Sequence, residues 1–258
     1  MPEGDTIAHA ARRMRPVLEG FVPDAIRTPN PRHALDRWPE RLAGRAITEI
    51  RTHGKHLFVG FDGGLVLHSH LRMTGSWGVY APGQRARRSM HRAWLVLERS
   101  GVQVVQFDGP VLELLTEGRA RSDQRLAALG PDVLAEAFDF AAFLTRLRAD
   151  DPTRGIGDAL LDQRNVAGIG NIWKAEGCWE AAIDPWRAVG EVSDAEARSI
   201  IELVRPRMLE SAQTGRMRET ARVFRRTGQP CPRCGARIRA RGQGDDNRTT
   251  FWCPGCQL

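Results

Sequence analysis

The sequence predicts an α+β protein built from several domains: an amino-terminal helix with a β-rich domain, a helical domain, and a small β-hairpin module. Three observations predict this order. Short β-branched segments fill the first part of the chain, apolar residues recur at helical spacing further on, and two cysteine pairs follow residue 222. The 258 residues are enough for two or three small domains, and we place the boundaries at 1–118, 122–215 and 222–258.

An amphipathic helix opens the chain. Asp5 or Thr6 is suited to cap this helix, and Gly20 is suited to end it. Between them, apolar residues recur every three or four positions and form one stripe, at positions 7, 10, 11, 14, 17 and 18. The helix therefore has one face to bury.

The segments after this helix have the character of strands. We expect strands at residues 46–51, 57–61, 65–70, 93–98 and 102–107, because these stretches alternate or are β-branched. Asp62-Gly63 and Ser100-Gly101 have the composition of hairpin turns. Strands at this spacing predict a sandwich or a barrel.

The pattern becomes helical near residue 120. Helical periodicity predicts helices at residues 124–129, 138–149, 157–163, 172–182 and 194–211. Gly-Pro, Asp-Pro and glycine-rich breaks separate them. The cysteine-bearing end that follows predicts a β-hairpin.

The charge distribution points to a polyanionic partner, most often nucleic acid. The chain has a net charge of +7, and only Lys55 and Lys174 among its 38 basic residues are lysines. Arginine suits phosphate contact because its planar fork donates two hydrogen bonds, although genomic base composition explains the same bias. Residues 205–258 carry 12 arginines against four acidic residues, so the rest is nearly neutral. A basic solvated surface is the alternative interpretation.

The composition also bears on the compartment. With 41% hydrophobic and 27% charged residues, the chain has a globular composition. No apolar run is long enough to span a membrane, and no signal segment opens the chain. We therefore expect a cytoplasmic protein that makes no membrane contact.

Four of the five cysteines form two C-x-x-C pairs with 18 residues between them: Cys231, Cys234, Cys253 and Cys256. This spacing predicts a tetrahedral zinc site, in which all four ligands are thiolates and the ion has a structural role. Two disulfides are the alternative, which a cytosolic chain disfavours. Cys178 stands apart in an apolar helical stretch and is expected to be a small buried hydrophobe.

The amino terminus carries a chemical signal. Met1 precedes the small residue Pro2, so we expect its removal to expose a prolyl secondary amine. An α-amine titrates near ~8 and lysine near ~10.4, so the terminus is unprotonated about a hundred times more often at neutral pH. A neutral amine can attack the C1′ aldehyde of an opened deoxyribose, and Glu3 is placed to move protons beside it. Many chains begin Met-Pro without a catalytic reason.

Two further segments are suited to DNA. Residues 155–179 read as helix, glycine-punctuated turn and helix, a common DNA-binding arrangement, although ordinary helix packing gives the same pattern. Gly168 and Gly170 would let the turn approach a backbone, and Asn171 with the amides that open the next helix would face a phosphate. Arg248, on the hairpin between the cysteine pairs, would form a rigid phosphate fork.

Three motifs in this order resemble one family closely. MPEG at the start, LLDQ…AGIGN in the middle and CPRCG…RTTFWCPGCQ at the end are similar to the formamidopyrimidine-DNA glycosylase and endonuclease VIII family. The resemblance runs from residue 2 to 257. It implies a catalytic β-sandwich domain (1–118), a helix-two-turn-helix DNA-binding domain (122–215) and a zinc finger (222–258). The implied protein is a monomer that acts on damaged DNA.

The resemblance also implies roles for single residues. Pro2 would be the Schiff-base nucleophile, and Glu3 the proton donor for base removal. Lys55 would donate the proton in β-elimination and contact a phosphate. Arg248 would assist δ-elimination and hold phosphate, and Asn171 would bind phosphate beside the lesion.

The segment of residues 68–75 resembles the family's loop that fills the hole left by the flipped base. We expect its Met73 to be the apolar wedge, with His70 and Arg72 as DNA contacts. His68 and His70 share one face of a strand, where packing or DNA contact is favoured over a second metal site.

The chain departs from the family pattern in two places. Thr6 stands where the family usually has a second glutamate, and Asp5 is not an obvious replacement. Around Phe107-Asp108-Gly109 the Arg-x-Phe-Gly element that probes cytosine opposite 8-oxoguanine is missing. The MPEG-D-T start of the chain and the missing Arg-x-Phe-Gly element favour the endonuclease VIII-like, actinobacterial-type branch. That branch implies oxidised pyrimidines as the preferred substrates. An 8-oxoguanine or formamidopyrimidine preference, or a non-catalytic lesion-binding role, remains the alternative.

Overall fold

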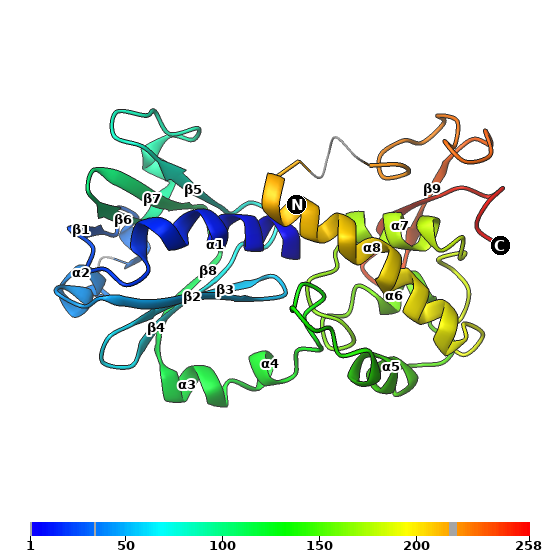
Figure 1. Cartoon of the computed structure of the whole chain (residues 1–258), viewed down its shortest axis with the longest axis horizontal. Coiled ribbons are helices and arrows are strands. Elements are labelled where there is room, and N and C mark those ends of the chain that lie inside the picture. The colour runs from blue at the N-terminus through cyan, green and yellow to red at the C-terminus, as the bar shows by residue number, and fades with distance from the viewer. Residues whose placement is uncertain (1, 34, 217–220) are drawn as a thin grey trace. The chain divides into compact units, whose positions relative to one another are not determined.

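The structure is a computed structural model that describes residues 2–33, 35–216 and 221–258. The chain forms two compact units, shown with their element labels in Figure 1. The first contains Pro2 and Thr6–Ala127, and the second contains Glu3–Asp5 and Ala128–Leu258. The predicted α+β class is confirmed. The division of the second unit at residues 215–222 stays a prediction.

Helix α1 (Gly4–Leu18) opens the chain as predicted, and Gly20 follows it with a φ of 83°. The predicted cap is wrong, because the helix already begins at Gly4. Thr6 is exposed, and the Asp5 carboxylate accepts a hydrogen bond from the Ser211 hydroxyl at 2.5 Å. From Ile7 onward, the apolar stripe is buried in the core of the first unit.

Two separate four-stranded antiparallel sheets make up most of the first unit, so the chain forms a sandwich and not a closed barrel. The inner faces of both sheets pack with α1 around one hydrophobic core. This core contains Leu57, Leu67, Leu95 and Val104. The strands pair in the orders β1-β6-β7-β5 and β2-β3-β4-β8. They are β1 (Ala25–Arg27), β2 (Ile47–His53), β3 (His56–Phe61), β4 (Leu65–His70), β5 (Ser76–Tyr80), β6 (Ala93–Arg99), β7 (Val102–Phe107) and β8 (Val111–Thr116).

The five predicted strands are present as β2, β3, β4, β6 and β7, and both predicted hairpin turns join the strands expected. Short helices complete the unit: α2 (Trp38–Leu42), α3 (Glu117–Ser122) and α4 (Gln124–Ala127), with 3-10 turns at Pro31–His33 and Met90–Arg92.

The second unit contains α5 (Phe140–Arg148), α6 (Ile156–Ala159), α7 (Asn171–Glu180) and α8 (Asp194–Thr214), followed by the hairpin of β9 (Arg239–Gln243) and β10 (Arg248–Trp252). Helix α8 starts with a capping box between Ser193 and Glu196 and ends at Gly215 with a φ of 72°.

Helix α7 lies between two apolar clusters of this unit. Trp173 packs with α8 in the helical core, whereas Trp179 packs with Cys231 and Ile238 of the cysteine-bearing end. Every residue from Asn171 to Trp179 is buried. The hairpin is therefore fixed on α7. Within the described residues, no helix has the length and apolar character needed to cross a membrane.

Candidate functional site

The carboxylate of Glu3 lies at the amino end of α7. It accepts hydrogen bonds from the backbone amides of Gly170 (3.0 Å), Ile172 (2.9 Å) and Trp173 (3.3 Å), and its side chain is fully buried. Amides at a helix start point outward and carry the positive end of the helix dipole. This arrangement stabilises the ionised carboxylate and fixes its orientation directly after Pro2.

The glycines of the turn before α7 make this approach possible. A Cβ on Gly170 would lie 2.3 Å from Cδ of Glu3, and Gly168 adopts a φ of 104°. The amide of Gly4 donates to the carbonyl of Gly168 at 2.9 Å. The turn therefore approaches the chain's own amino-terminal segment closely, and its predicted approach to a DNA backbone stays a prediction.

The expectation that the amides opening α7 face a phosphate is wrong. The carboxylate of Glu3 accepts hydrogen bonds from these amides instead. Glu3 and Gly170 are 167 positions apart in the sequence. A carboxylate is itself an anion, so it satisfies the helix terminus in the way a phosphate would.

Asn171 and Arg248 lie on neighbouring elements of the second unit. The amide nitrogen of Asn171 donates to the carbonyl of Thr249 at 2.7 Å, and its Oδ1 is buried without a partner among the described residues. Thr249 directly follows Arg248, whose guanidinium forks onto the exposed carboxylate of Asp246 at 2.9 and 3.1 Å. The structure thus brings the two predicted phosphate contacts onto the joined ends of α7 and β10.

Of the two lysines, Lys174 is not available as a nucleophile. Its side chain is fully buried, and its amine donates to the hydroxyl of Thr250. Burial lowers the pKa of Lys174 to about 8. The low pKa alone would favour nucleophilic chemistry, but no surface of this residue reaches solvent.

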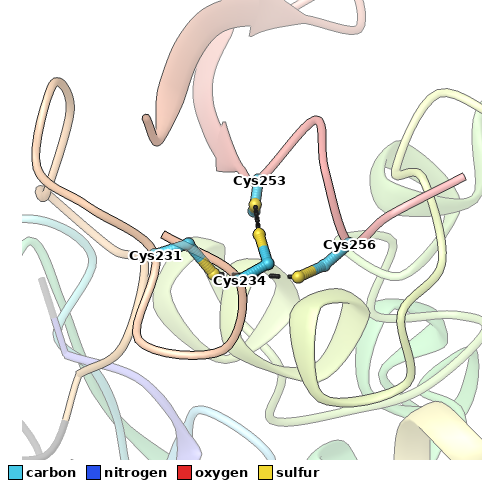
Figure 2. Close-up of side chains that lie close together, drawn as sticks. All are labelled: Cys231, Cys234, Cys253 and Cys256. Carbon is cyan, nitrogen blue, oxygen red and sulfur yellow. Dashed lines mark hydrogen bonds between the residues drawn. The ribbon is translucent and has the colours of Figure 1, made fainter. Parts of the chain in front are cut away.

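The four paired cysteines form a metal site in the second unit. Their sulfur atoms all lie within 4.8 Å of one another, and Figure 2 shows them directed at one another from the two chain turns that hold them. The indole of Trp179 donates to Sγ of Cys231 at 3.3 Å, and the Arg233 amide donates to the same sulfur at 3.5 Å. The set is suited to one zinc ion, with four protein ligands and no open position.

Within the described residues, no second group of three or more such ligands occurs. Cys178 is buried in α7, and burial raises its pKa to about 12. The thiol therefore stays protonated and serves as a small apolar residue, as predicted.

In the first unit, Lys55 lies at the tip of the β2–β3 hairpin. The turn is Gly54-Lys55, and Gly54 has a φ of 55°, as the first position of a II′ turn requires. Directly after it, His56 pairs across the sheet with His70. Burial, with smaller effects from neighbouring histidines and Lys55, lowers the pKa of His56 to about 3.

The histidines next to Lys55 form a hydrogen-bonded chain. Glu113 lies 3.3 Å from Nδ1 of His68, and Nε2 of His68 lies 2.8 Å from Nδ1 of His56. A carboxylate only accepts, so Nδ1 of His68 donates to it and Nε2 of the neutral ring accepts from His56. Each ring therefore has one defined tautomer.

His70 is also neutral, because burial lowers its pKa to about 4. The amide of Arg72 donates to its Nδ1 at 3.3 Å, so the proton of the neutral ring is on Nε2. His70 is suited to donate one hydrogen bond to a phosphate oxygen without carrying charge. Arg72 has a φ of 43°, and the side chain of Met73 after it is 65% exposed.

The loop that carries Met73 is fixed by Asp108. Arg88 donates to the carboxylate of Asp108 at 2.6 Å and to the carbonyl of Thr74 at 2.9 Å, and Arg92 pairs with Asp108 at 2.8 Å. The residue after Phe107 therefore contributes an acid that anchors two arginines. Met73 keeps an exposed, fixed position.

The sequence did not predict the charged residues that bond to partners far away in the sequence and so hold the site together. These are Lys174, Glu113, Asp108, Arg88 and Glu176. One signal was available, since Lys174 is one of only two lysines in an arginine-rich chain. Buried Glu176 accepts three amide hydrogen bonds from residues 222–224, at 2.8 to 3.0 Å, and pairs with Arg207. Met1 lies outside the described residues, and Pro2 is half-buried.

Three family models match the chain. They are the formamidopyrimidine-DNA glycosylase N-terminal domain (residues 1–110), the H2TH domain of the same enzymes (129–222) and the zinc finger found in FPG and IleRS (228–258). The order agrees with the β-rich unit, the helical segment and the cysteine-bearing hairpin.

Relatives match over the whole chain. A probable endonuclease 8 2 of Streptomyces coelicolor is 41% identical over 100% of this chain and 94% of its own length, and a DNA-(apurinic or apyrimidinic site) lyase Nei2 of Mycolicibacterium smegmatis is 35% identical over 100% and 99%. The crystal structure of Lactococcus lactis Fpg (MutM) with N7-benzyl-Fapy-dG DNA superposes with a TM-score of 0.84 at 26% identity, covering both chains fully. The chain belongs to the formamidopyrimidine-DNA glycosylase and endonuclease 8 family of DNA-repair glycosylases and AP lyases.

Proposed function

We propose that this chain excises oxidised bases from DNA, with pyrimidines preferred, and cuts the abasic strand by β,δ-elimination through a Schiff base at Pro2. The position of Glu3 carries the proposal. Its carboxylate is buried and fixed by three amides of the turn and first residues of α7, directly after the residue that becomes the amino terminus. A purely structural acid needs no such position beside a free amine.

The prolyl nitrogen starts the reaction as a neutral nucleophile. It bonds to C1′ of the deoxyribose as the bond from C1′ to the base breaks, and the departing base takes up a proton from water. The nitrogen gives up its own proton, for which Glu3 is the adjacent acceptor, because its hydrogen bonds favour the ionised form. Glu3 can return that proton when the sugar ring opens to the iminium.

The iminium then drives two eliminations. It withdraws electrons from C2′, so a C2′ proton is lost and the 3′ phosphate leaves. A second elimination across C4′ and C5′ releases the 5′ phosphate, and water frees the prolyl nitrogen from the sugar fragment. Lys55 supplies a proton in the first elimination, and Arg248 and Asn171 hold the phosphates.

The preference for pyrimidines rests on the loop after β7. The loop itself is Asp108-Gly109-Pro110, which contains no arginine that could probe a cytosine opposite 8-oxoguanine, and Asp108 holds Arg88 and Arg92. The 41% identity to a protein named probable endonuclease 8 2 favours the endonuclease 8-like branch. Met73 supplies the apolar wedge that stabilises the flipped state, which costs a few kcal/mol of unstacking.

A panel of defined lesions tests the proposal. Protein with a verified Pro2 terminus is incubated with duplexes that carry thymine glycol, dihydrouracil or 8-oxoguanine opposite cytosine, with and without borohydride. We expect faster excision of the two pyrimidines and a covalent adduct in every productive reaction. If only the purine lesion is cut, the substrate preference is wrong. If duplexes bind but no adduct forms, the chain is a lesion-binding protein.

Two variants make the panel specific. Pro2→Gly leaves a primary amine and is expected to reduce trapping sharply, and wild-type trapping would assign the chemistry to another amine. Protein that retains Met1 has an amide at Pro2, and we expect it to bind DNA without cutting it. Robust cleavage by verified Met1-retaining protein would contradict the mechanism.

A further inference from the structure

Lys174 is a buried cation that stability alone does not explain. Its side chain is fully buried, and within the described residues its amine forms no ion pair, although Asp158 and Glu3 act on it at longer range. Its partners are neutral: the hydroxyl of Thr250 and, at 3.5 Å, Oε1 of Gln243. Burying an ammonium without a counterion costs several kcal/mol, and an apolar residue of similar size would often be more stable. A function is therefore the better explanation for the charge.

The amine joins helix α7 to the hairpin of β9 and β10. The hydroxyl of Thr250 donates onward to Oε1 of Gln243 at 2.8 Å, and the Gln243 amide donates to the carbonyl of Pro185 at 2.6 Å. One turn earlier on the same face of α7, Asn171 bonds to the carbonyl of Thr249. Residues 249 and 250, which directly follow Arg248, are thus held to α7 by two adjacent side chains.

The charged surroundings of Lys174 come from three other parts of the second unit. Asp158 on α6 and Glu3 favour its protonated form, whereas Arg248 on β10 disfavours it. Lys174 and Arg248 therefore lie close enough within the second unit to repel each other. A phosphate beside Arg248 would be attracted by both charges.

We propose that Lys174 is a positioning residue that fixes β10 to the amino end of α7, so that Asn171 and Arg248 bind phosphate as one unit. This inference rests on the proposed function, because it assigns the phosphate role to Asn171 and Arg248. Lys174 itself does not touch DNA. Its effect passes through Thr250 to the strand that carries Arg248.

The test is the affinity of the full-length, zinc-loaded protein for a duplex with a tetrahydrofuran abasic analogue, measured over a range of salt concentrations. Lys174→Met removes the charge at nearly constant volume and leaves the bond between Thr250 and Gln243 in place. We expect one zinc per chain, a melting temperature no lower than that of the wild type, and about 10-fold weaker binding. The slope of log affinity against log salt should fall by about one, although the replaced side chain is buried.

A double-mutant cycle with Arg248→Ala separates positioning from a general effect of charge. If Lys174 acts through Arg248, the double variant binds within about twofold of Arg248→Ala alone. Arg198→Met is the charge-matched control, because it removes an exposed cation on α8 that pairs with Glu202. We expect the control to keep the wild-type affinity and salt slope.

Several results would overturn the proposal. These are binding of Lys174→Met within twofold of the wild type, an unchanged salt slope, or multiplicative losses in the double variant. If Lys174→Met loses zinc or unfolds, Thr250→Val becomes decisive, because it keeps the charge and removes the link, and wild-type binding by that variant would refute the idea. The duplex is not cleaved, so a failure of Pro2 to form an adduct leaves this test intact.

Discussion

In residues 128–258 and 3–5, three charged side chains near the candidate site are buried and hydrogen-bonded, whereas two candidate site residues of the first unit lie on a turn and a loop. Glu3 and Glu176 each accept three backbone amides, and Lys174 bonds to Thr250. Lys55 and Met73 instead lie at loop tips of a β-sandwich. The first arrangement fixes the geometry of buried groups, and the second places Lys55 and Met73 at the ends of loops.

The two units also differ in the charge state of their buried ionisable side chains. The sandwich keeps His56 and His70 neutral through burial. The helical unit keeps its charges and satisfies them with hydrogen bonds. A substitution in the second unit should therefore disturb the positions of residues far away in the sequence, whereas a substitution in the first unit should act locally.

The largest effect is expected from loss of the metal. Cys253→Ser removes one of four thiolate ligands, and the hairpin that carries Arg248 then loses its zinc and its order. We expect DNA affinity to fall more than about 100-fold while the sandwich stays folded, as measured by zinc content, anisotropy and hydrogen exchange. Cys178→Ala is the control, because that cysteine is not a ligand. Full affinity in zinc-free Cys253→Ser protein would refute this dependence.

The next largest effect is expected from Gly170→Ala. Its Cβ would meet the Glu3 carboxyl carbon at 2.3 Å, so the carboxylate must leave the amides of α7. We expect base excision to slow by about 100-fold, in the range of a lost acid–base catalyst, with zinc retained. The rate is measured by single-turnover excision of dihydrouracil.

Gly118→Ala is the matched control for this variant. No atom lies within 4 Å of the added Cβ, and the residue is on the short helix α3 of the sandwich unit. Its excision rate should equal that of the wild type. An unchanged rate for Gly170→Ala as well would show that the position of Glu3 does not matter.

An effect of intermediate size is expected from acid, which should destabilise the first unit at a higher pH than the second. The folded pKa values of His56 (about 3) and His70 (about 4) lie below the unfolded value of 6.5, so the unfolded sandwich binds more protons as the pH falls. Stability is complete above pH 6.5 and declines below it. By pH 5 we expect a loss of about 2 kcal/mol for each histidine.

The second unit should respond only at lower pH. Arg187 lowers the pKa of Glu196 to about 2, and Arg164 lowers that of Asp162 to about 2. Their contribution is present above the usual carboxyl range and is lost as the pH falls toward 2. Hydrogen exchange at pH 7 and pH 5, corrected for intrinsic rates, checks the difference. Earlier opening of peptides from the helical unit would contradict it.

The smallest effect is expected at Asp246. This exposed carboxylate occupies the fork of Arg248, and such surface pairs contribute about 0–1 kcal/mol. Asp246→Asn frees the fork and should strengthen binding of the abasic analogue about twofold. Asp245→Asn is the control, because it removes the same charge from a residue that is not bonded to Arg248. An equal gain in affinity in both variants would show that only the net charge matters.

Much of this could be predicted from local sequence patterns. The apolar stripe of α1, the strands on either side of Ser100-Gly101 and the spacing of Cys231, Cys234, Cys253 and Cys256 are signals within a few residues, and the structure confirms them. The strands β1, β5 and β8 were missed, because their patterns are short or weak and pairing partners stabilise them.

The connections within the site could not be predicted in this way. The amide of Gly170 bonds to Glu3 across 167 positions, and Lys174 bonds to Thr250 across 76. A local pattern at a helix start indicates only that an anion is favoured there. Whether that anion is a phosphate or the chain's own carboxylate depends on tertiary contacts.

The central claim is that the amine exposed at Pro2 forms the covalent bond to the sugar. Tandem mass spectrometry of the borohydride-reduced complex with abasic DNA tests this most directly, because it identifies the modified residue. We expect a deoxyribose remnant on the prolyl nitrogen of the first processed residue. A remnant on Lys55, or on any other residue, would contradict it.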